Sequence, residues 1–195
     1  SGGTTLKGFG KAAGIPAATF ASGGSLNTAR GYHGGAGTDH EALLAFGGTT
    51  GTAVNNVEQY NGSSWSEVAE INTTRANLTG FGSSTAAIAG NGSTPTKVET
   101  ESWNGSAWSE IAELNFSRSD SASAGTQTSG MVATGTPVPG NPSLRPGGSS
   151  IVTETWNGTS WTEVGDTNTQ RLQAGMAGSG TTSASIIAAG EDGPG

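Results

Sequence analysis

The residues with the clearest potential for chemistry are two histidines and the acids beside them. His33 and His40 are the only histidines in the chain, and Asp39 and Glu41 flank the second one. Imidazole and carboxylate groups in this arrangement could form a metal site or a general acid–base pair. They also fit a polar loop before the apolar run 42–46, which is the interpretation we favour. We therefore assign no catalytic, cofactor-binding or metal-binding residue.

Acidic residues recur at regular places and raise a second possibility. They form the pairs Glu67/Glu70, Glu110/Glu113 and Glu163/Asp166. Carboxylates around one rim could hold calcium, but a charged sheet edge also discourages pairing with foreign strands, and we favour that role. Four arginines recur once per unit and could bridge to these acids, in which case they are structural ties rather than ligand-binding groups: Arg30, Arg75, Arg118 and Arg171.

Composition excludes several classes of function. The chain has 195 residues, of which 34 are glycine and none is cysteine, so disulfides, thiolate metal sites and cysteine nucleophiles are excluded. A net charge of −7 argues against nucleic acid or an anionic membrane as a partner. No apolar run approaches the roughly 18 residues of a membrane-spanning helix. Membrane insertion and enzyme activity are not expected.

One sequence unit is copied along the chain. The motif E-x-[YW]-N-G-[ST]-x-W-[ST]-E-[VI] begins at Glu58, Glu101 and Glu154, and each copy is followed by Asn-x-x-Arg. A fourth Asn-x-x-Arg tag ends at Arg30. The tag arginines are 45, 43 and 53 residues apart, which indicates a unit of about 43 to 45 residues with one insertion.

Each unit predicts four short strands. Asn-Gly accepts positive φ and nucleates a hairpin, and the aromatic residues on either side of it then share one sheet face. The predicted pairs are Tyr60 with Trp65, Trp103 with Trp108, and Trp156 with Trp161. Short apolar runs ending in glycine, such as 42–46 and 86–89, suit inner strands. Four strands in about 45 residues match one blade of a β-propeller.

The units divide the chain into one repeat domain over residues 1–195. It comprises a half-unit at 1–24 and repeats at about 25–70, 71–113, 114–166 and 167–195. Inner-strand motifs occur five times but outer aromatic hairpins only three times. We expect that this segment alone does not complete a ring, so that either residues are missing or a partner chain supplies strands.

These features resemble a known family. The doublets Gly23-Gly24 and Gly47-Gly48, followed by an aromatic residue and a tryptophan, look like kelch repeats. The full motif with its Asn-x-x-Arg tail resembles kelch-like virion and tail-associated proteins of tailed marine bacteriophages, over about residues 25 to 190. The resemblance implies an all-β, complete or partial kelch-like β-propeller of four-stranded antiparallel blades. The later doublets depart from the pattern, as Gly90-Asn91-Gly92, Thr134-Gly135 and Gly190-Glu191.

Two functions follow as expectations. The first is a non-enzymatic virion component (capsid decoration, tail or fibre) that contacts other subunits, is oligomeric and could attach to a host-surface glycan. The alternative is a secreted or cell-surface carbohydrate-binding propeller. Aromatic residues could act as sugar platforms, and the proline-rich insertion near 136–150 could make contacts. The candidate contact residues are Tyr60, Trp103, Trp156, Pro139, Asn141 and Arg145. Trp65, Trp108 and Trp161, with the four tag arginines, are assigned to the repeat structure.

Overall fold

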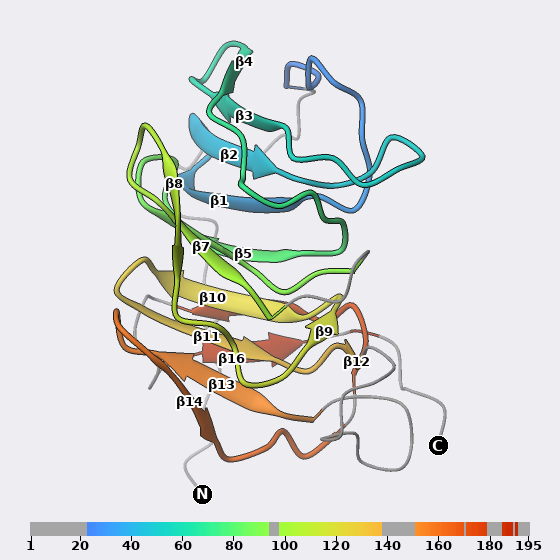
Figure 1. Cartoon of the computed structure of the whole chain (residues 1–195), viewed down its shortest axis with the longest axis vertical. Helices are drawn as coiled ribbons and strands as arrows, with labels where there is room; N and C mark the ends of the chain where they lie inside the picture. The colour runs from blue at the N-terminus through green and yellow to red at the C-terminus, as the bar shows by residue number, and fades with distance from the viewer. Residues whose placement is uncertain are drawn as a thin grey trace, which may run out of the picture.

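A computed structural model describes residues 23–93, 98–137, 151–169, 171–178, 185–188 and 190. Every regular element in these ranges is a β-strand (Figure 1). Most of the predicted half-unit 1–24 lies outside them, as do Pro139, Asn141 and Arg145 of the insertion.

Three complete sheets repeat one design, with four antiparallel strands in sequence order. Sheet 1 contains β1 (Gly34–Asp39), β2 (Ala42–Phe46), β3 (Val57–Tyr60) and β4 (Trp65–Val68). Sheet 2 contains β5 (Thr79–Gly82), β6 (Ala87–Gly90), β7 (Thr100–Trp103) and β8 (Trp108–Ile111). Sheet 3 contains β10 (Ala122–Thr126), β11 (Ser129–Ala133), β13 (Thr153–Trp156) and β14 (Trp161–Val164). The predicted all-β fold with four-stranded antiparallel sheets is confirmed.

Two smaller pairings accompany these sheets. β15 (Gly175–Gly178) pairs with β16 (Ser185–Ala188), in the same way that the first two strands of each sheet pair; we call this the half-sheet. β9 (Arg118–Ser119) pairs with β12 (Thr136–Pro137), close to the base of the insertion.

The outer hairpins place the aromatic residues directly opposite each other. Tyr60 pairs with Trp65 in register, and their ring centroids lie 5.1 Å apart. The equivalent pairs of sheets 2 and 3, Trp103–Trp108 and Trp156–Trp161, lie at 5.3 and 5.2 Å. The predicted same-face pairing is confirmed.

The turn between these strands differs in one detail from the expectation. Only its glycine adopts positive φ, as at Gly62 (+90°). The asparagine acts through its side chain instead: Oδ1 of Asn61 accepts hydrogen bonds from the amides of Ser63 and Ser64, both at 3.0 Å. This local bond satisfies two loop amides and fixes a four-residue turn.

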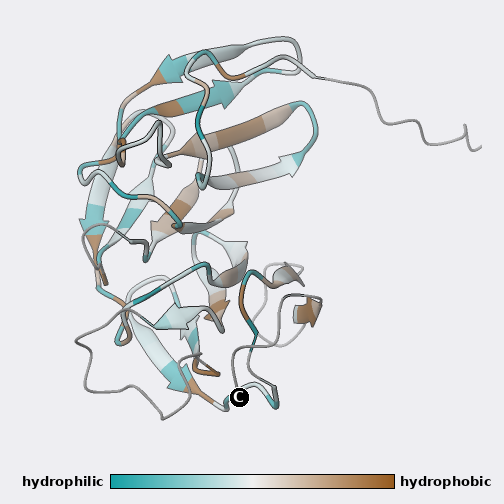
Figure 2. Ribbon diagram, turned by 90° about the vertical axis from the view of Figure 1, so that its right-hand side faces the viewer, coloured by the Kyte–Doolittle hydropathy of each residue, from teal (hydrophilic) through white to brown (hydrophobic). Residues whose placement is uncertain are grey.

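Successive sheets stack through their first strands. β1 lies beside β5, β5 beside β10, and β10 beside β15. Figure 2 shows that the stack of sheets is curved.

Two hydrophobic clusters fill the spaces between the sheets. The first joins Leu44, Phe46 and Val57 of sheet 1 to Trp103 and Trp108 of sheet 2. In the second, Phe81 and Ile88 of sheet 2 meet Val132, Trp156 and Trp161 of sheet 3. Each sheet therefore has a front face, which carries the aromatic pair, and a back face. The front of one sheet packs on the back of the sheet before it.

Candidate functional site

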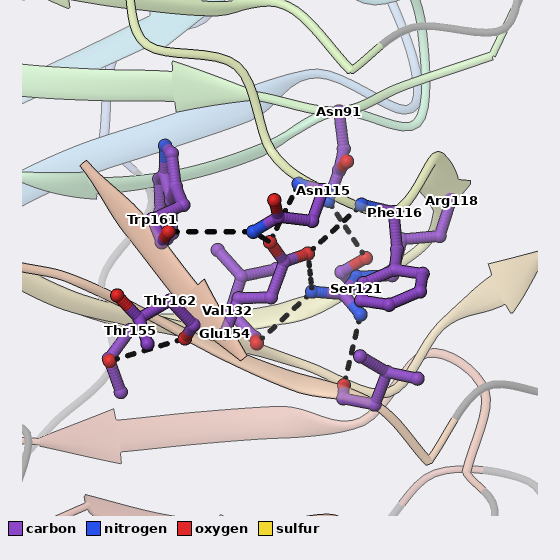
Figure 3. A network of polar contacts seen from close by, with 11 residues as sticks. Asn91, Asn115, Phe116, Arg118, Ser121, Val132, Glu154, Thr155, Trp161 and Thr162 are labelled. Carbon is purple, nitrogen blue, oxygen red and sulfur yellow. Dashed lines mark hydrogen bonds and ion pairs between the residues drawn. The ribbon is translucent and has the colours of Figure 1, made fainter. Parts of the chain in front are cut away.

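Within the described residues, a buried polar clamp surrounds three of the four tag arginines. In sheet 3, Nη2 of Arg118 lies 3.1 Å from Oε1 of Glu154, and Nη1 donates to the carbonyl of Val152 at 3.0 Å (Figure 3). Asn115 completes the clamp, donating to Glu154 Oε2 through its backbone amide at 2.7 Å and its side-chain amide at 2.9 Å. The asparagine and the arginine of the tag thus bind one carboxylate.

The same clamp occurs in the other two complete sheets. Arg75 Nη2 lies 2.7 Å from Glu101 Oε1, and the Asn72 amide donates to Glu101 Oε2 at 2.7 Å. In sheet 1, Arg30 bonds to Glu58, which also accepts the Asn27 amide at 2.6 Å. The side chains of all three arginines and all three glutamates are almost completely removed from solvent.

For Arg30, Arg75 and Arg118, the partner is therefore not the predicted rim acid. The partner is the glutamate that opens the repeat motif, on the third strand of each sheet. The rim acids Glu67, Glu110 and Glu163 lie directly opposite these glutamates on the fourth strand. Two like charges in register would repel each other, and the buried arginine offsets that repulsion.

Burial and pairing shift the ionisation of the clamp groups in opposite directions. Burial lowers the pKa of Arg118 to about 10, while the carboxylates of Glu154 and Glu163 oppose that shift. Burial alone would raise the pKa of Glu58, but the Asn27 and Thr28 amides and Arg30 outweigh it, and its pKa lies below the usual value. Hydrogen bonds to a charged carboxylate favour the ionised form.

Three of the four tag arginines also contact the preceding sheet through their backbone. The amides of Gly48, Gly92 and Gly135 donate to the carbonyls of Arg75, Arg118 and Arg171, at 2.9, 3.2 and 3.2 Å. The guanidinium of Arg75 binds sheet 2 while its carbonyl binds the loop that follows β2 of sheet 1. The arginine of the clamp therefore connects two consecutive sheets.

These glycines explain why the doublets vary in sequence. The first doublet position is left-handed in all three sheets, at Gly47, Asn91 and Thr134, with φ from +57° to +62°. The second position has φ above +100° and is always glycine. A Cβ on Gly48 would lie 2.6 Å from the carbonyl oxygen of Gly31. Only the second position requires glycine. The first glycine of the doublet can therefore be replaced by asparagine or threonine while the loop keeps its conformation.

The candidate contact aromatics have very different environments. Trp103 and Trp156 are only 1% and 3% exposed, because the preceding sheet covers them. They do not present a face to a sugar in this chain. Tyr60, the equivalent residue of sheet 1, is half-buried together with Trp65. The front of sheet 1 is therefore the open member of a repeated surface.

A cleft of about 620 Å³ lies on the inner side of the stack. Glycine and small side chains of the first strands line most of it, including Gly35, Gly80 and Ser123. Leu43 and Trp65 of the sheet 1 front also border the cleft, so the open aromatic pair is continuous with it.

Of the two histidines, His33 borders the cleft and His40 lies in the turn between β1 and β2. His40 is highly exposed beside Glu41, with 3.8 Å between Nε2 and Oε1. Nδ1 of His33 contacts the carbonyl of its neighbour Gly34. Within the described residues no three His, Asp or Glu side chains gather as a metal ion would require. In the same part of the chain no helix has the length and apolarity needed to cross a membrane.

Comparison with known proteins adds no identification. No family model matches the chain, and a search of curated proteins finds no match.

Proposed function

We propose that this chain is a non-enzymatic structural and interaction protein, a bacteriophage virion component built as a kelch-like propeller array. It would serve as a capsid decoration, tail or fibre subunit, in assembly or in host-surface attachment. The likeness of its repeat motif to kelch-like phage proteins supports the setting. The use of the recurring charged residues to join sheets supports a structural role.

One observation carries the interaction role. Tyr60 and Trp65 are half-buried, whereas both equivalent pairs are buried between sheets. An aromatic pair at the edge of a concave surface has the composition of a protein contact, where tyrosine and tryptophan supply much of the binding energy. The front of sheet 1 is thus more accessible than the equivalent fronts of sheets 2 and 3, which are buried between sheets.

The test is the composition of purified particles. Phage particles whose genome encodes this chain are banded on a density gradient, and their proteins are quantified by mass spectrometry. The proposal predicts that the chain stays with the particles at a fixed copy number per capsid. Recovery only in the soluble fraction of the lysate, with particles otherwise complete, would overturn it.

Carbohydrate binding is the second candidate, because Tyr60 is only half-buried and pairs with Trp65, which borders the cleft. A glycan array probed with the chain and with Tyr60→Ala tests this role. Binding that is lost in the variant would support it, and no binding to any glycan would remove it. Trp103→Phe is the matched control, since a buried ring cannot contribute to a sugar site.

A further inference from the structure

The two ends of the sheet stack expose opposite halves of one repeated interface. Inside the chain that interface forms twice. Phe46 on the back of sheet 1 meets Trp108 on the front of sheet 2, with centroids 5.2 Å apart in an edge-to-face arrangement. Phe81 of sheet 2 meets Trp161 of sheet 3 at 6.3 Å. At both junctions the aromatic front of one sheet packs on the back of the preceding sheet, which carries aliphatic and aromatic side chains.

The front of sheet 1 has the residues of this interface, but no sheet packs on it. The segment at Gly23 and Gly24 lies against part of the aromatic pair, and Nε1 of Trp65 donates to the Gly24 carbonyl at 2.9 Å. Ile71 and Leu114 precede the tag asparagines of sheets 2 and 3 and are 1% and 3% exposed. Leu26 holds the same position for sheet 1 and is half-buried, as are Tyr60 and Trp65. The charges behind this face are already paired, because Arg30 and Glu58 are fully buried against each other. An apolar partner could therefore cover it without leaving an unpaired charge.

The far end of the stack exposes the complementary back. Leu44, Ile88 and Ile186 occupy the same register position, opposite the third residue of the first strand in their sheets. Leu44 and Ile88 are each 1% exposed, whereas Ile186 is 72% exposed. Val164 ends β14 as Val68 ends β4 and Ile111 ends β8; those two residues pack against the clusters, while Val164 is 37% exposed.

We propose that the front of sheet 1, with Leu26, Tyr60 and Trp65, docks the back of the half-sheet, with Ile186, of a second copy of this chain. The inference rests on the proposed interaction role and names the partner. Because the two surfaces differ, the association is heterologous, head to tail. Copies joined in this way continue the stack through the same contact that joins its sheets. They form a closed ring or an open filament according to the curvature.

Complementary variants test the head-to-tail arrangement. Native mass spectrometry and light scattering are applied to the chain, to Tyr60→Asp (front) and to Ile186→Asp (back). The wild-type chain is expected to form oligomers and each variant to be a monomer. An equimolar mixture of the two variants is expected to form one-to-one heterodimers, because each still carries one intact face. Thr159→Asp adds the same charge in an exposed turn and should leave the oligomers unchanged.

Three results would overturn the inference: a monomeric wild-type chain at tens of micromolar, variants that oligomerise as the wild type does, or a mixture that stays monomeric. Leu26→Asp replaces Tyr60→Asp as the front variant if circular dichroism shows that the latter is unfolded. The outcome is independent of the particle analysis. If the chain is present in particles but the two variants do not form heterodimers, only the head-to-tail contact is refuted. If the variants form heterodimers but the chain is absent from particles, only the virion role is refuted.

Discussion

Nη2 of Arg75 lies 2.7 Å from Oε1 of Glu101, and solvent reaches almost none of either side chain. The carbonyl of the same arginine accepts the Gly48 amide from the preceding sheet at 2.9 Å. A single residue therefore joins the two sheets by its side chain on one side and its backbone on the other. Arg118 repeats both contacts one sheet later.

Removing the carboxylate of this clamp should destabilise the fold strongly. Glu101→Ala leaves Arg75 as a buried, uncompensated charge, which costs about 3–5 kcal/mol of unfolding free energy. Urea denaturation measures the change. Glu110→Ala is the matched control, because Glu110 lies directly opposite Glu101 but is exposed, and its loss should cost under about 1 kcal/mol. Equal effects of the two variants would show that the clamp does not stabilise the fold.

The clamp of sheet 1 should make stability depend on pH. Because the pKa of Glu58 in the folded chain is below its usual 4.5, folding favours the ionised carboxylate. This contribution is complete above about pH 4.5 and is lost as the pH falls through the folded pKa. Urea midpoints measured from pH 7 to pH 3 should decline less in Glu58→Gln than in the wild type. A Glu58→Gln curve parallel to the wild type, or one matching the Glu67→Gln control, would refute this assignment.

Gly48→Ala should destabilise the chain, whereas Gly31→Ala should not. Gly48 has a φ of +107°, and a Cβ there would lie 2.6 Å from the Gly31 carbonyl oxygen. A strained backbone of this kind costs about 1–3 kcal/mol. A Cβ on Gly31 meets nothing within 4 Å. Thermal melts of the two variants test the difference, and equal melting temperatures would mean that the loop adapts to the added methyl group.

Tryptophan quenching should distinguish the open front from the covered ones. Trp103, Trp108, Trp156 and Trp161 are all buried, while Trp65 is half-buried. In dilute solution, acrylamide should quench a minor part of the fluorescence, and Trp65→Phe should abolish that part. If the accessible fraction persists in Trp65→Phe, the covered pairs are more open than the structure shows.

Local patterns in the sequence predicted most of the sheet architecture. Asn-Gly between aromatic residues set the hairpin register of Tyr60 and Trp65 because turn preference and same-face alternation act within a dozen residues. The ion-pair partner of Arg75 could not be predicted from these local patterns. Glu101 and Glu110 recur with the same period, and only the three-dimensional register shows that the former points into the clamp. The motif position of Glu101, first in every repeat, was the available signal.

The openness of the sheet 1 front was also hidden from the sequence. Tyr60, Trp103 and Trp156 occupy the same motif position, so a pattern treats them as equals. Their exposure differs because it depends on whether a sheet lies before them in the stack. Which sheet packs on which aromatic pair is known only from the three-dimensional arrangement of the sheets.

The measurement that tests the central claim most directly is a cryo-electron microscopy reconstruction of particles that contain the chain. The account predicts ordered four-stranded sheets at symmetry-related positions, with Tyr60 and Trp65 of each copy covered by a neighbouring subunit. Particles that lack the chain, or that hold it with this aromatic pair open to solvent, would contradict the claim that the array is an assembly component that uses its open front.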